Sequence, residues 1–298
     1  MRNKTGKYNI TSKPILLTIF IVLVFLLVIF LRSSSLPQSH QISSVTSDVN
    51  TQTKPISCPP IENQLPATSH TCNKLPTATA ETLVHYVTSN ITPQQTYKEI
   101  SVSLRVLTKK SPCNFLVFGL GYDSPMWATL NQGGRTVFLE EDKSWIQQIQ
   151  GKFPNLESYH VVYDTKVTHS SDLMEIGKQG QCKRVGDPRE SECELSMKRN
   201  LPDEVYDVEW DAIMVDAPTG YHDEAPGRMK AIYTAGLMAR NREEGETNVF
   251  VHDINRVVED QFSKTFLCEG YLSEEEGRLR HFIIPSHRAR SGRPFCPL

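Results

Sequence analysis

A run of seventeen residues near the N-terminus is apolar except for one threonine, which limits what this part of the chain can form. Residues 15–31 read ILLTIFIVLVFLLVIFL, with Thr18 as the polar member. A helix of this length just crosses the hydrocarbon core of a bilayer. A buried core helix is disfavoured because the run is apolar on all sides, and the apolar part of a cleaved signal peptide is usually shorter and followed by a small-residue cleavage site. The run therefore predicts a retained transmembrane anchor.

The residues on either side of this run differ in charge and composition. Four basic residues precede it and one follows it, which favours a cytosolic N-terminus. The next stretch is dominated by Ser, Thr, Gln and Pro and has few apolar residues to bury, as expected of a flexible stem. A short span also suits the thinner membranes of the early secretory pathway. We predict a single-pass type II signal-anchor protein with a cytosolic tail (1–14), an anchor (15–31), a lumenal stem (32–76) and a folded domain (77–298).

Beyond the anchor, the chain is net acidic and contains all of its cysteines. Five of the 32 basic residues and none of the 34 acidic ones precede residue 33. We therefore expect no nucleic acid partner, because phosphates need a basic surface. The seven cysteines lie on the lumenal side, where disulfides persist, and their odd number leaves at least one unpaired or bonded to another chain. Cys182 and Cys193 lie close enough in the sequence to close a short loop.

From residue 92 onward, short apolar runs alternate with helical stretches. Thr92, Pro93 and Gln95 form a capping-box pattern that predicts the start of a helix. Another helix is expected around residues 145–149. Strands are expected at 114–118, 136–139, 159–163, 211–215 and 248–251, with later ones at 270–272 and 281–284. This alternation predicts an α/β fold with a mostly parallel sheet and helices on both faces.

The ends of the first predicted strands favour the binding of a nucleoside, since ligands of such sheets bind beyond the carboxyl ends of the strands. Gly119 and Gly121 allow the backbone to approach a ligand, and Glu140 ends the next strand, where a carboxylate can hold two ribose hydroxyls. Ser124 stands where a dinucleotide site has its third glycine, which favours S-adenosylmethionine over a pyrophosphate cofactor. Asp164, after the third strand, is expected on the adenine side. The alternative for the two glycines is a tight turn.

Several longer segments resemble a known family. They are SPCNFLVFGLG (111–121), FPNLESYHVVYDTKV (153–167), DAPTGYHDEAPGRM (216–229), AIYTAGLMARNREEGET (231–247) and RLRHFIIPSHRARSGRPFC (278–296). From about residue 72 to the C-terminus, the chain resembles the plant Golgi glucuronoxylan 4-O-methyltransferases. The resemblance implies a Rossmann-like methyltransferase sheet. It also implies transfer of a methyl group from S-adenosylmethionine to O4 of glucuronic acid on xylan, in the Golgi membrane, during secondary cell wall synthesis.

Other functions stay open at this point. Related family members are implicated in methylating glucuronic acid on arabinogalactan, and others affect xylan formation without a clear transferase role. A glycosyltransferase would share the anchor and stem, but the sequence contains no Asp-x-Asp metal motif. A non-catalytic component that associates with other xylan-synthesis enzymes would keep the fold without needing the methyl donor. Binding of the donor would distinguish an enzyme from such a component.

Carboxylates and histidines after the fourth and fifth predicted strands are the candidate catalytic groups. A sugar hydroxyl is a poor nucleophile until a base removes its proton or a metal polarises it. The candidates are Asp216, His222, His252 and Asp253. Asp216, Asp253 and Asn255 also resemble the metal ligands of catechol-type O-methyltransferases, with Ile254 intervening, and such oxygen ligands suit magnesium, manganese or cobalt. Alternatively, Asp216 caps a helix and His252 is a core histidine.

Arginines are the residues expected to bind the carboxylate of an acidic sugar. Residues 278–298 contain five arginines and no acid, although the chain beyond the anchor is acidic overall. A guanidinium fork binds a carboxylate through two parallel hydrogen bonds. The candidates on the substrate side are Tyr221, Arg228, Arg256, Arg288 and Arg290. The alternative for the tail is a solvated charged surface.

Overall fold

The computed structural model of the protein describes residues 75–290 and 292–297. The predicted cytosolic tail, the anchor at 15–31 and all but the last two residues of the predicted stem lie outside this part of the chain. Within the described residues, no helix combines the length and the apolar composition needed to cross a membrane. The anchor and the stem therefore stay predictions.

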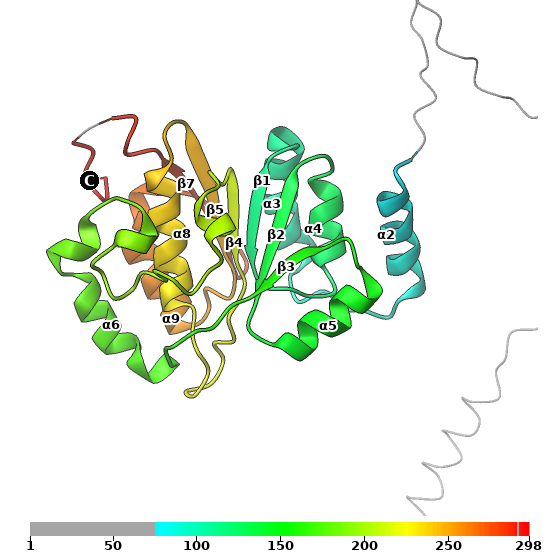
Figure 1. Ribbon diagram of the computed structural model, residues 1–298, viewed down its shortest axis with the longest axis horizontal. Helices are drawn as coiled ribbons and strands as arrows, with labels where there is room; N and C mark the ends of the chain where they lie inside the picture. The colour runs from blue at the N-terminus through cyan, green and yellow to red at the C-terminus, as the bar shows by residue number, and fades with distance from the viewer. Residues whose placement is uncertain (1–74, 291, 298) are drawn as a thin grey trace, which may run out of the picture. The chain divides into compact units, whose positions relative to one another are not determined.

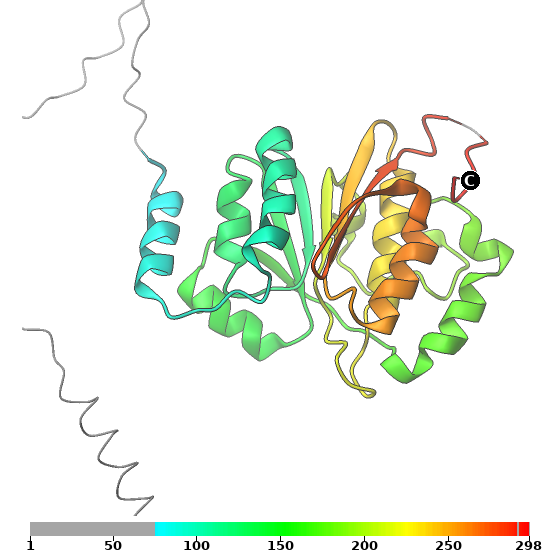
Figure 2. The ribbon, with the colours of Figure 1, turned by 180° about the vertical axis from the view of Figure 1, so that it is seen from behind.

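Seven strands of the described residues form one sheet in the order β3-β2-β1-β4-β5-β7-β6 (Figures 1 and 2). Strands β1 to β5 pair in parallel, whereas β7 runs antiparallel to β5 and β6. The strands are β1 Asn114–Phe118, β2 Arg135–Glu140, β3 Glu157–His160, β4 Ala212–Val215, β5 Glu246–Val251, β6 Leu272–Glu276 and β7 Leu279–Pro285. This is a Rossmann-like sheet with an antiparallel hairpin beside β5. The predicted fold class is confirmed.

Helices cover both faces of this sheet. In Figures 1 and 2, α3, α4 and α5 lie on one side and α6, α8 and α9 on the other. The α-helices are α2 Thr77–Thr88, α3 Tyr97–Lys110, α4 Ser124–Leu130, α5 Lys143–Lys152, α6 Ser170–Gly177, α7 Asp203–Tyr206, α8 Met229–Asn241 and α9 Val257–Phe262. Shorter helical turns are η1 Val167–His169, η2 Gly180–Lys183, η3 Pro188–Glu190, the π-helical η4 Ser263–Cys268 and η5 Glu269–Tyr271.

Alternate side chains of β1 enter different hydrophobic cores. Leu116 and Phe118 belong to the core beneath α8 and α9, whereas Phe115 and Val117 belong to the core beneath α4 and α5. Because side chains of a strand alternate between faces and both faces are covered, nearly every position of β1 is buried. This explains why the strand is a continuous apolar run in the sequence.

The predicted start of the helix at Thr92 is wrong by one turn. Thr96 caps α3, and its side chain and that of Glu99 form the reciprocal capping box. Both threonines are followed three residues later by Glu or Gln, so the local pattern does not distinguish them. The carboxylate of Glu99 also accepts the backbone N–H of Arg278 at 2.6 Å, which anchors this second box in the fold. Residues 91–95 are consequently outside the helix.

Several strand boundaries also differ from the prediction, most of all those of β3 and β6. Strand β3 ends at His160 and not at residue 163, because it is an edge strand and its partner β2 ends at Glu140, opposite His160. Strand β6 begins at Leu272, since the preceding residues 269–271 form the turn η5.

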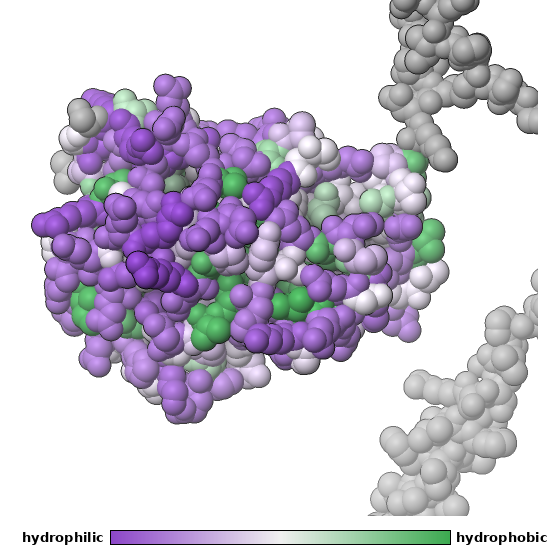
Figure 3. All heavy atoms as spheres, in the orientation of Figure 1, coloured by the Kyte–Doolittle hydropathy of each residue, from purple (hydrophilic) through white to green (hydrophobic). Residues whose placement is uncertain are grey.

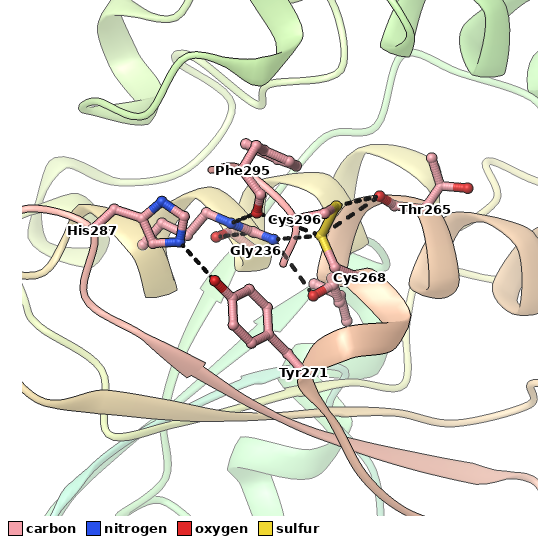
Figure 4. The surroundings of a disulfide bond; sticks show 9 residues. Gly236, Thr265, Cys268, Tyr271, His287, Phe295 and Cys296 are labelled. Atoms are coloured by element: carbon pink, nitrogen blue, oxygen red, sulfur yellow. Dashed lines mark hydrogen bonds between the residues drawn. A yellow bond between two sulfur atoms is a disulfide. The ribbon is translucent and has the colours of Figure 1, made fainter. Parts of the chain in front are cut away.

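Two disulfides hold a polar loop and the C-terminal tail. Cys182–Cys193 closes the short loop that the spacing predicted, and Cys268–Cys296 ties the tail to the end of η4 (Figure 4). The guanidinium of the buried Arg240 lies 4.0 Å from the ring centroid of Phe295 and donates to the Phe295 carbonyl oxygen. The end of the tail therefore packs on the protein. Among the cysteines that the structure describes, Cys113 is buried and forms no disulfide.

The face shown in Figure 3 is mainly hydrophilic. Apolar atoms at its right-hand edge lie over α2, whose Leu83, Val84 and Val87 are exposed. The inner side of α2 is held on α4 by a hydrogen bond of 3.0 Å between the hydroxyls of Thr82 and Thr129.

Candidate functional site

A cavity of about 640 Å³ lies at the carboxyl ends of the parallel strands. Its size is in the usual range for a site that holds a small ligand. Its walls come from residues 91–95 before α3, 119–124 after β1, 140–141 at the end of β2, most of 216–221 after β4, and Asp253 and Arg256 after β5. This is the edge of the sheet at which the sequence predicts a ligand.

Gly119, Gly121 and Glu140 lie together on one wall of this cavity. Gly119 has a φ of +127°, a conformation that side-chain-bearing residues rarely adopt. The Glu140 carboxylate accepts the backbone N–H groups of Leu120 at 3.2 Å and Asp142 at 2.9 Å, so it is fixed across the glycine turn. Burial raises the pKa of Glu140. A fixed carboxylate beside an open backbone fits the ribose part of a nucleoside.

Asp123 is a second acid on this wall that the sequence analysis did not single out. Trp127 Nε1 donates to its carboxylate at 2.9 Å. Desolvation, together with the nearby charge of Asp216, raises the pKa of Asp123. A Cβ atom at Gly121 would lie 2.8 Å from Asp123 Oδ1, so the glycine leaves room for this carboxylate. In the sequence, Asp123 precedes Ser-Pro at a helix start, where an acid is an ordinary capping residue.

Glu141 also has an unused acceptor in this region. Its Oε1 accepts from the backbone N–H of Thr219 at 3.1 Å and from the Thr219 hydroxyl at 2.8 Å, whereas Oε2 is buried without a hydrogen-bond partner. Trp145 lines the same wall and donates its indole N–H to the Leu120 carbonyl at 2.7 Å. The glycine turn, the fixed Glu140 carboxylate, the acidic Asp123 and this free acceptor together fit S-adenosylmethionine, which carries a ribose, an adenine and an ammonium group.

Asp216 lies after β4 and is held from two sides. Its Oδ1 accepts from His252 Nδ1 at 2.9 Å, and its Oδ2 accepts from Gln95 Nε2 at 3.1 Å. Burial alone would raise the pKa of Asp216, but the hydrogen bond from His252 and the charge of Arg228 outweigh it and lower the pKa. The carboxylate is therefore ionised at neutral pH. Because an ionised carboxylate only accepts, Nδ1 of the buried His252 carries the proton.

The carboxylate of Asp253 forms ion pairs with three arginines. Its carboxylate lies 3.0 Å from Arg228 Nη2, 2.9 Å from Arg256 Nη2 and 2.8 Å from Arg278 Nη1. The residue is buried and has a φ of +62°, a left-handed conformation that is uncommon for a residue with a side chain. This strain is maintained by the surrounding ion pairs. The arrangement makes Asp253 an anchor for guanidinium groups.

Arg228 is predicted to bind the substrate, but its hydrogen-bond donors are already used by groups of the protein. It is 4% exposed, and its donors reach the carbonyl oxygens of Pro218 at 3.1 Å, His252 at 2.9 Å and Asp216. It also lies 3.4 Å from the Asp216 carboxylate, and 3.8 Å from the buried Glu259. Arg228 thus joins the ends of β4 and β5, and its fork has little capacity left for a substrate carboxylate.

The acidic groups at this edge do not fit a divalent cation. Asp216, His252 and Asp253 each offer a ligand atom within 4.8 Å of one another. However, Asp216 and His252 are hydrogen-bonded to each other, and Asp253 already meets three guanidinium groups, which would repel a cation. The predicted third ligand, Asn255, is exposed and does not line the cavity. We derive no step through a metal.

The remaining predicted residues divide into two sets. Tyr221 and Arg256 line the cavity. His222 is exposed on the loop after β4 and is not part of the cavity wall. Asp164 is exposed and pairs with Lys230 at 2.8 Å, away from the cavity lining.

Arg288 and Arg290 lie at the other end of the sheet from the cavity. Strand β7 is antiparallel, with Pro285 opposite Glu246 at the start of β5, so the tail leaves the sheet at the amino ends of the parallel strands. Arg288 pairs there with Glu243 at 3.4 Å, and Arg290 is exposed. Their positive charge in the sequence did not reveal which end of the sheet they occupy.

Comparison with known proteins places this site in context. Residues 98–282 match the family described as IRX15/IRX15L/GXM. The chain is 60% identical to glucuronoxylan 4-O-methyltransferase 3 of Arabidopsis thaliana over 93% of this chain and 92% of that protein. It is 50% identical to arabinogalactan O-methyltransferase 2 of the same plant over 72% of this chain and 77% of that protein. Among solved structures, an O-methyltransferase from Bacillus cereus in complex with SAH is similar, with a TM-score of 0.38 and 12% identity over 72% of this chain and 93% of that one.

Proposed function

Because this chain belongs to the IRX15/IRX15L/GXM family, we propose that it transfers a methyl group from S-adenosylmethionine to O4 of glucuronic acid side chains of glucuronoxylan. The observation that carries the proposal is one cavity that is lined both by the glycine turn with the Glu140 carboxylate and by the ionised Asp216. The name of glucuronoxylan 4-O-methyltransferase 3 supports glucuronoxylan as the acceptor. Arabinogalactan is the second candidate acceptor, favoured by the similarity to the arabinogalactan enzyme.

On the donor wall, each residue has a distinct task. Gly119 and Gly121 let the donor approach the backbone, Glu140 holds the ribose hydroxyls, and Asp123 pairs with the ammonium group of the methionine portion. When bound, S-adenosylmethionine supplies an electrophilic methyl group on a sulfonium. Burial and the charge of Asp216 raise the pKa of Asp123 and so disfavour its ionised form. A bound cationic group would stabilise the ionised carboxylate and lower this pKa again.

On the acceptor side, Asp216 takes the proton from the O4 hydroxyl. As that proton moves to the carboxylate, the oxygen forms a bond to the methyl carbon and the carbon–sulfur bond breaks, so that S-adenosylhomocysteine leaves as a neutral thioether. His252 holds Oδ1 through its Nδ1–H and fixes the plane of the carboxylate. Oriented proton acceptors of this kind contribute about 10²- to 10⁴-fold to a rate.

Arg256 is our candidate for recognising the acidic group of the sugar. It lines the cavity, and its side chain is 27% exposed, in contrast to the enclosed Arg228. Asp253 at 2.9 Å and Glu259 at 3.7 Å hold its guanidinium in place. The glucuronate carboxylate is carried by C5, next to C4, so a fork that binds it also orients the O4 hydroxyl.

The function is tested directly by incubating the purified folded domain with labelled S-adenosylmethionine and oligosaccharides from glucuronoxylan or arabinogalactan. We expect label in 4-O-methylglucuronic acid, with the larger kcat/KM on the xylan oligosaccharide. Donor binding without transfer to either acceptor would instead support a non-catalytic role in xylan synthesis.

Replacing Arg256 with lysine should lower kcat/KM on glucuronate-bearing oligosaccharide about tenfold to a hundredfold, because a point charge cannot reproduce a charge-assisted fork. Oligosaccharides whose glucuronate is reduced to glucose should be poor substrates of the wild type, and the variant should no longer discriminate between the two. Arg288→Lys is the matched control, since Arg288 lies at the opposite end of the sheet. Equal methylation of native and reduced acceptors by the wild type would rule out carboxylate recognition.

We also propose that the folded domain faces the Golgi lumen, held by residues 15–31 as a type II anchor, where it can associate with other xylan-synthesis enzymes. The supporting observations are the apolar run and the two disulfides, which persist in the oxidising secretory pathway. In intact Golgi vesicles, protease should cut beyond residue 33 once detergent is present. Cleavage of that region without detergent would contradict this topology.

A further inference from the structure

Gln95 is a buried amide on the cavity wall with an unused hydrogen-bond acceptor. The residue is 4% exposed and lines the cavity. Its Nε2 donates to Asp216 Oδ2 at 3.1 Å, and its Oε1 is buried without any partner. A buried carbonyl oxygen that lacks a donor is costly and uncommon in folded proteins. Its position on a cavity wall indicates that a ligand supplies the missing donor.

The orientation of this amide follows from the charge of its neighbour. Asp216 is ionised, and a carboxylate can only accept hydrogen bonds. If the Gln95 amide were flipped, two acceptor oxygens would face each other across about 3 Å, which is repulsive. The NH₂ group therefore stays on Asp216, and Oε1 remains the open acceptor.

Gln95 contacts Asp216 directly, whereas Arg256 is linked to it through Asp253 and Arg228. Gln95 binds Oδ2, whereas Oδ1 faces His252 and Arg228. Arg228 lies 3.0 Å from Asp253, and Asp253 in turn holds Arg256. A sugar hydroxyl placed at Asp216 thus lies in the same cavity as an open amide oxygen and an arginine fork.

Glucuronic acid has matching groups around its C4 hydroxyl. C5 on one side bears the carboxylate, and C3 on the other side bears a hydroxyl, which is a hydrogen-bond donor. We propose that Gln95 Oε1 accepts the hydrogen bond of the C3 hydroxyl, so that Gln95 and Arg256 together place O4, and no other hydroxyl, at Asp216. This inference rests on the proposed function and adds a residue that determines which oxygen is methylated. The bonds made and broken remain those of the methyl transfer described above.

The test combines a variant with a modified acceptor. Gln95→Met keeps the length of the side chain and removes its hydrogen-bonding groups. The acceptors are a glucuronate-bearing xylan oligosaccharide and its analogue with a 3-deoxy-glucuronate. For the wild type, loss of the C3 hydroxyl should reduce kcat/KM about tenfold to a hundredfold, because Oε1 is then left unpaired in the complex. For Gln95→Met, the two acceptors should differ by less than about threefold, since their common partner is gone.

Three measurements separate this inference from its alternatives. Gln95→Met should bind S-adenosylmethionine as the wild type does by calorimetry, and Gln147→Met, at an exposed glutamine of α5, should discriminate between the acceptors like the wild type. If Gln95 acted only through Asp216, the variant would lose the same factor on both acceptors and the acidic limb of its pH profile would shift. That result, or equal use of both acceptors by the wild type, would overturn the assignment. Absence of methyl transfer to any acceptor would instead refute the proposed function.

Discussion

Replacing Asp216 with asparagine is expected to reduce turnover by about 10²-fold or more, because the nearly isosteric amide cannot take the proton of the attacking hydroxyl. Asparagine keeps a hydrogen-bonding side chain between His252 and Gln95, so the fold and the affinity for S-adenosylmethionine should be preserved. Single-turnover rates with saturating donor measure the chemical step, and calorimetry measures donor binding. Because the pKa of Asp216 is lowered, wild-type activity should not show an acidic limb at the usual pKa of an aspartate.

Two controls define what the loss at Asp216 would mean. Asp172→Asn changes an exposed aspartate of α6 and should leave turnover unchanged. Exhaustive chelation of the wild type should also leave turnover unchanged. Three guanidinium groups already pair with the Asp253 carboxylate, and their positive charge repels a divalent cation. Activity that chelation removes and magnesium, manganese or cobalt restores would show that the reaction requires a divalent metal, contrary to this expectation. Activity of Asp216→Asn close to that of the wild type would leave Asp216 with a structural role only.

Replacing Arg228 with methionine is expected to produce the largest loss of stability. The change leaves Asp216, Asp253 and Glu259 near one another without their shared cation, and removal of one partner of a buried ion pair costs about 3–5 kcal/mol. Both oxygens of Glu259 already lack hydrogen-bond partners, and burial raises its pKa, so it depends strongly on nearby positive charge. Thermal unfolding of the purified domain should show a midpoint lower by roughly 6–20 °C.

The same variant distinguishes a structural arginine from a substrate-binding one. Any Arg228→Met protein that stays folded at low temperature should still prefer native over carboxyl-reduced acceptor, because Arg256 is intact. Arg256→Met should show the reverse, with a smaller loss of stability, since its side chain is 27% exposed, and no preference between acceptors. A stable Arg228→Met protein that no longer recognises the carboxylate would restore Arg228 to the substrate side, where the sequence analysis expected it.

Local patterns were sufficient for the strands, apart from their exact ends, and for the glycine and carboxylate residues that line the cavity. Residues 115–118 of β1 are buried on both faces and are all apolar, so their sequence and their position in the sheet agree. Gly119, Gly121 and Glu140 follow strand ends, and the carboxyl ends of neighbouring parallel strands necessarily meet at one edge. The same logic brought Asp216 to that edge. The short separation of Cys182 and Cys193 likewise predicted their disulfide.

The roles of the polar side chains could not be predicted from local patterns, because they depend on which other segments lie beside them in the fold. Gln95 was expected to cap a helix, but Glu99 is also bound by the backbone of Arg278 in the β6–β7 hairpin, which moves the capping box by one turn and leaves Gln95 on the cavity wall. The tail arginines are at the wrong end of the sheet because β7 runs antiparallel. Arg228 and Arg256 both line the cavity, yet the side chain of Arg228 is 5% exposed and enclosed by carbonyls and carboxylates, whereas that of Arg256 is 27% exposed.

The physical reason for this division is the range of the forces involved. Burial of apolar side chains and the geometry of strands and turns act along a few consecutive residues, so hydrophobic period and glycine position predict the sheet and its edge. The role of an arginine or a glutamine is set by which charges and unpaired polar atoms come within about 3–4 Å of it. Gln95 contacts Asp216, 121 positions away in the chain, and Arg228 contacts the carbonyl oxygen of His252 after β5, so only the folded arrangement brings these groups together. Arg256 is held by Asp253, three residues away, but its place on the cavity wall also depends on the fold.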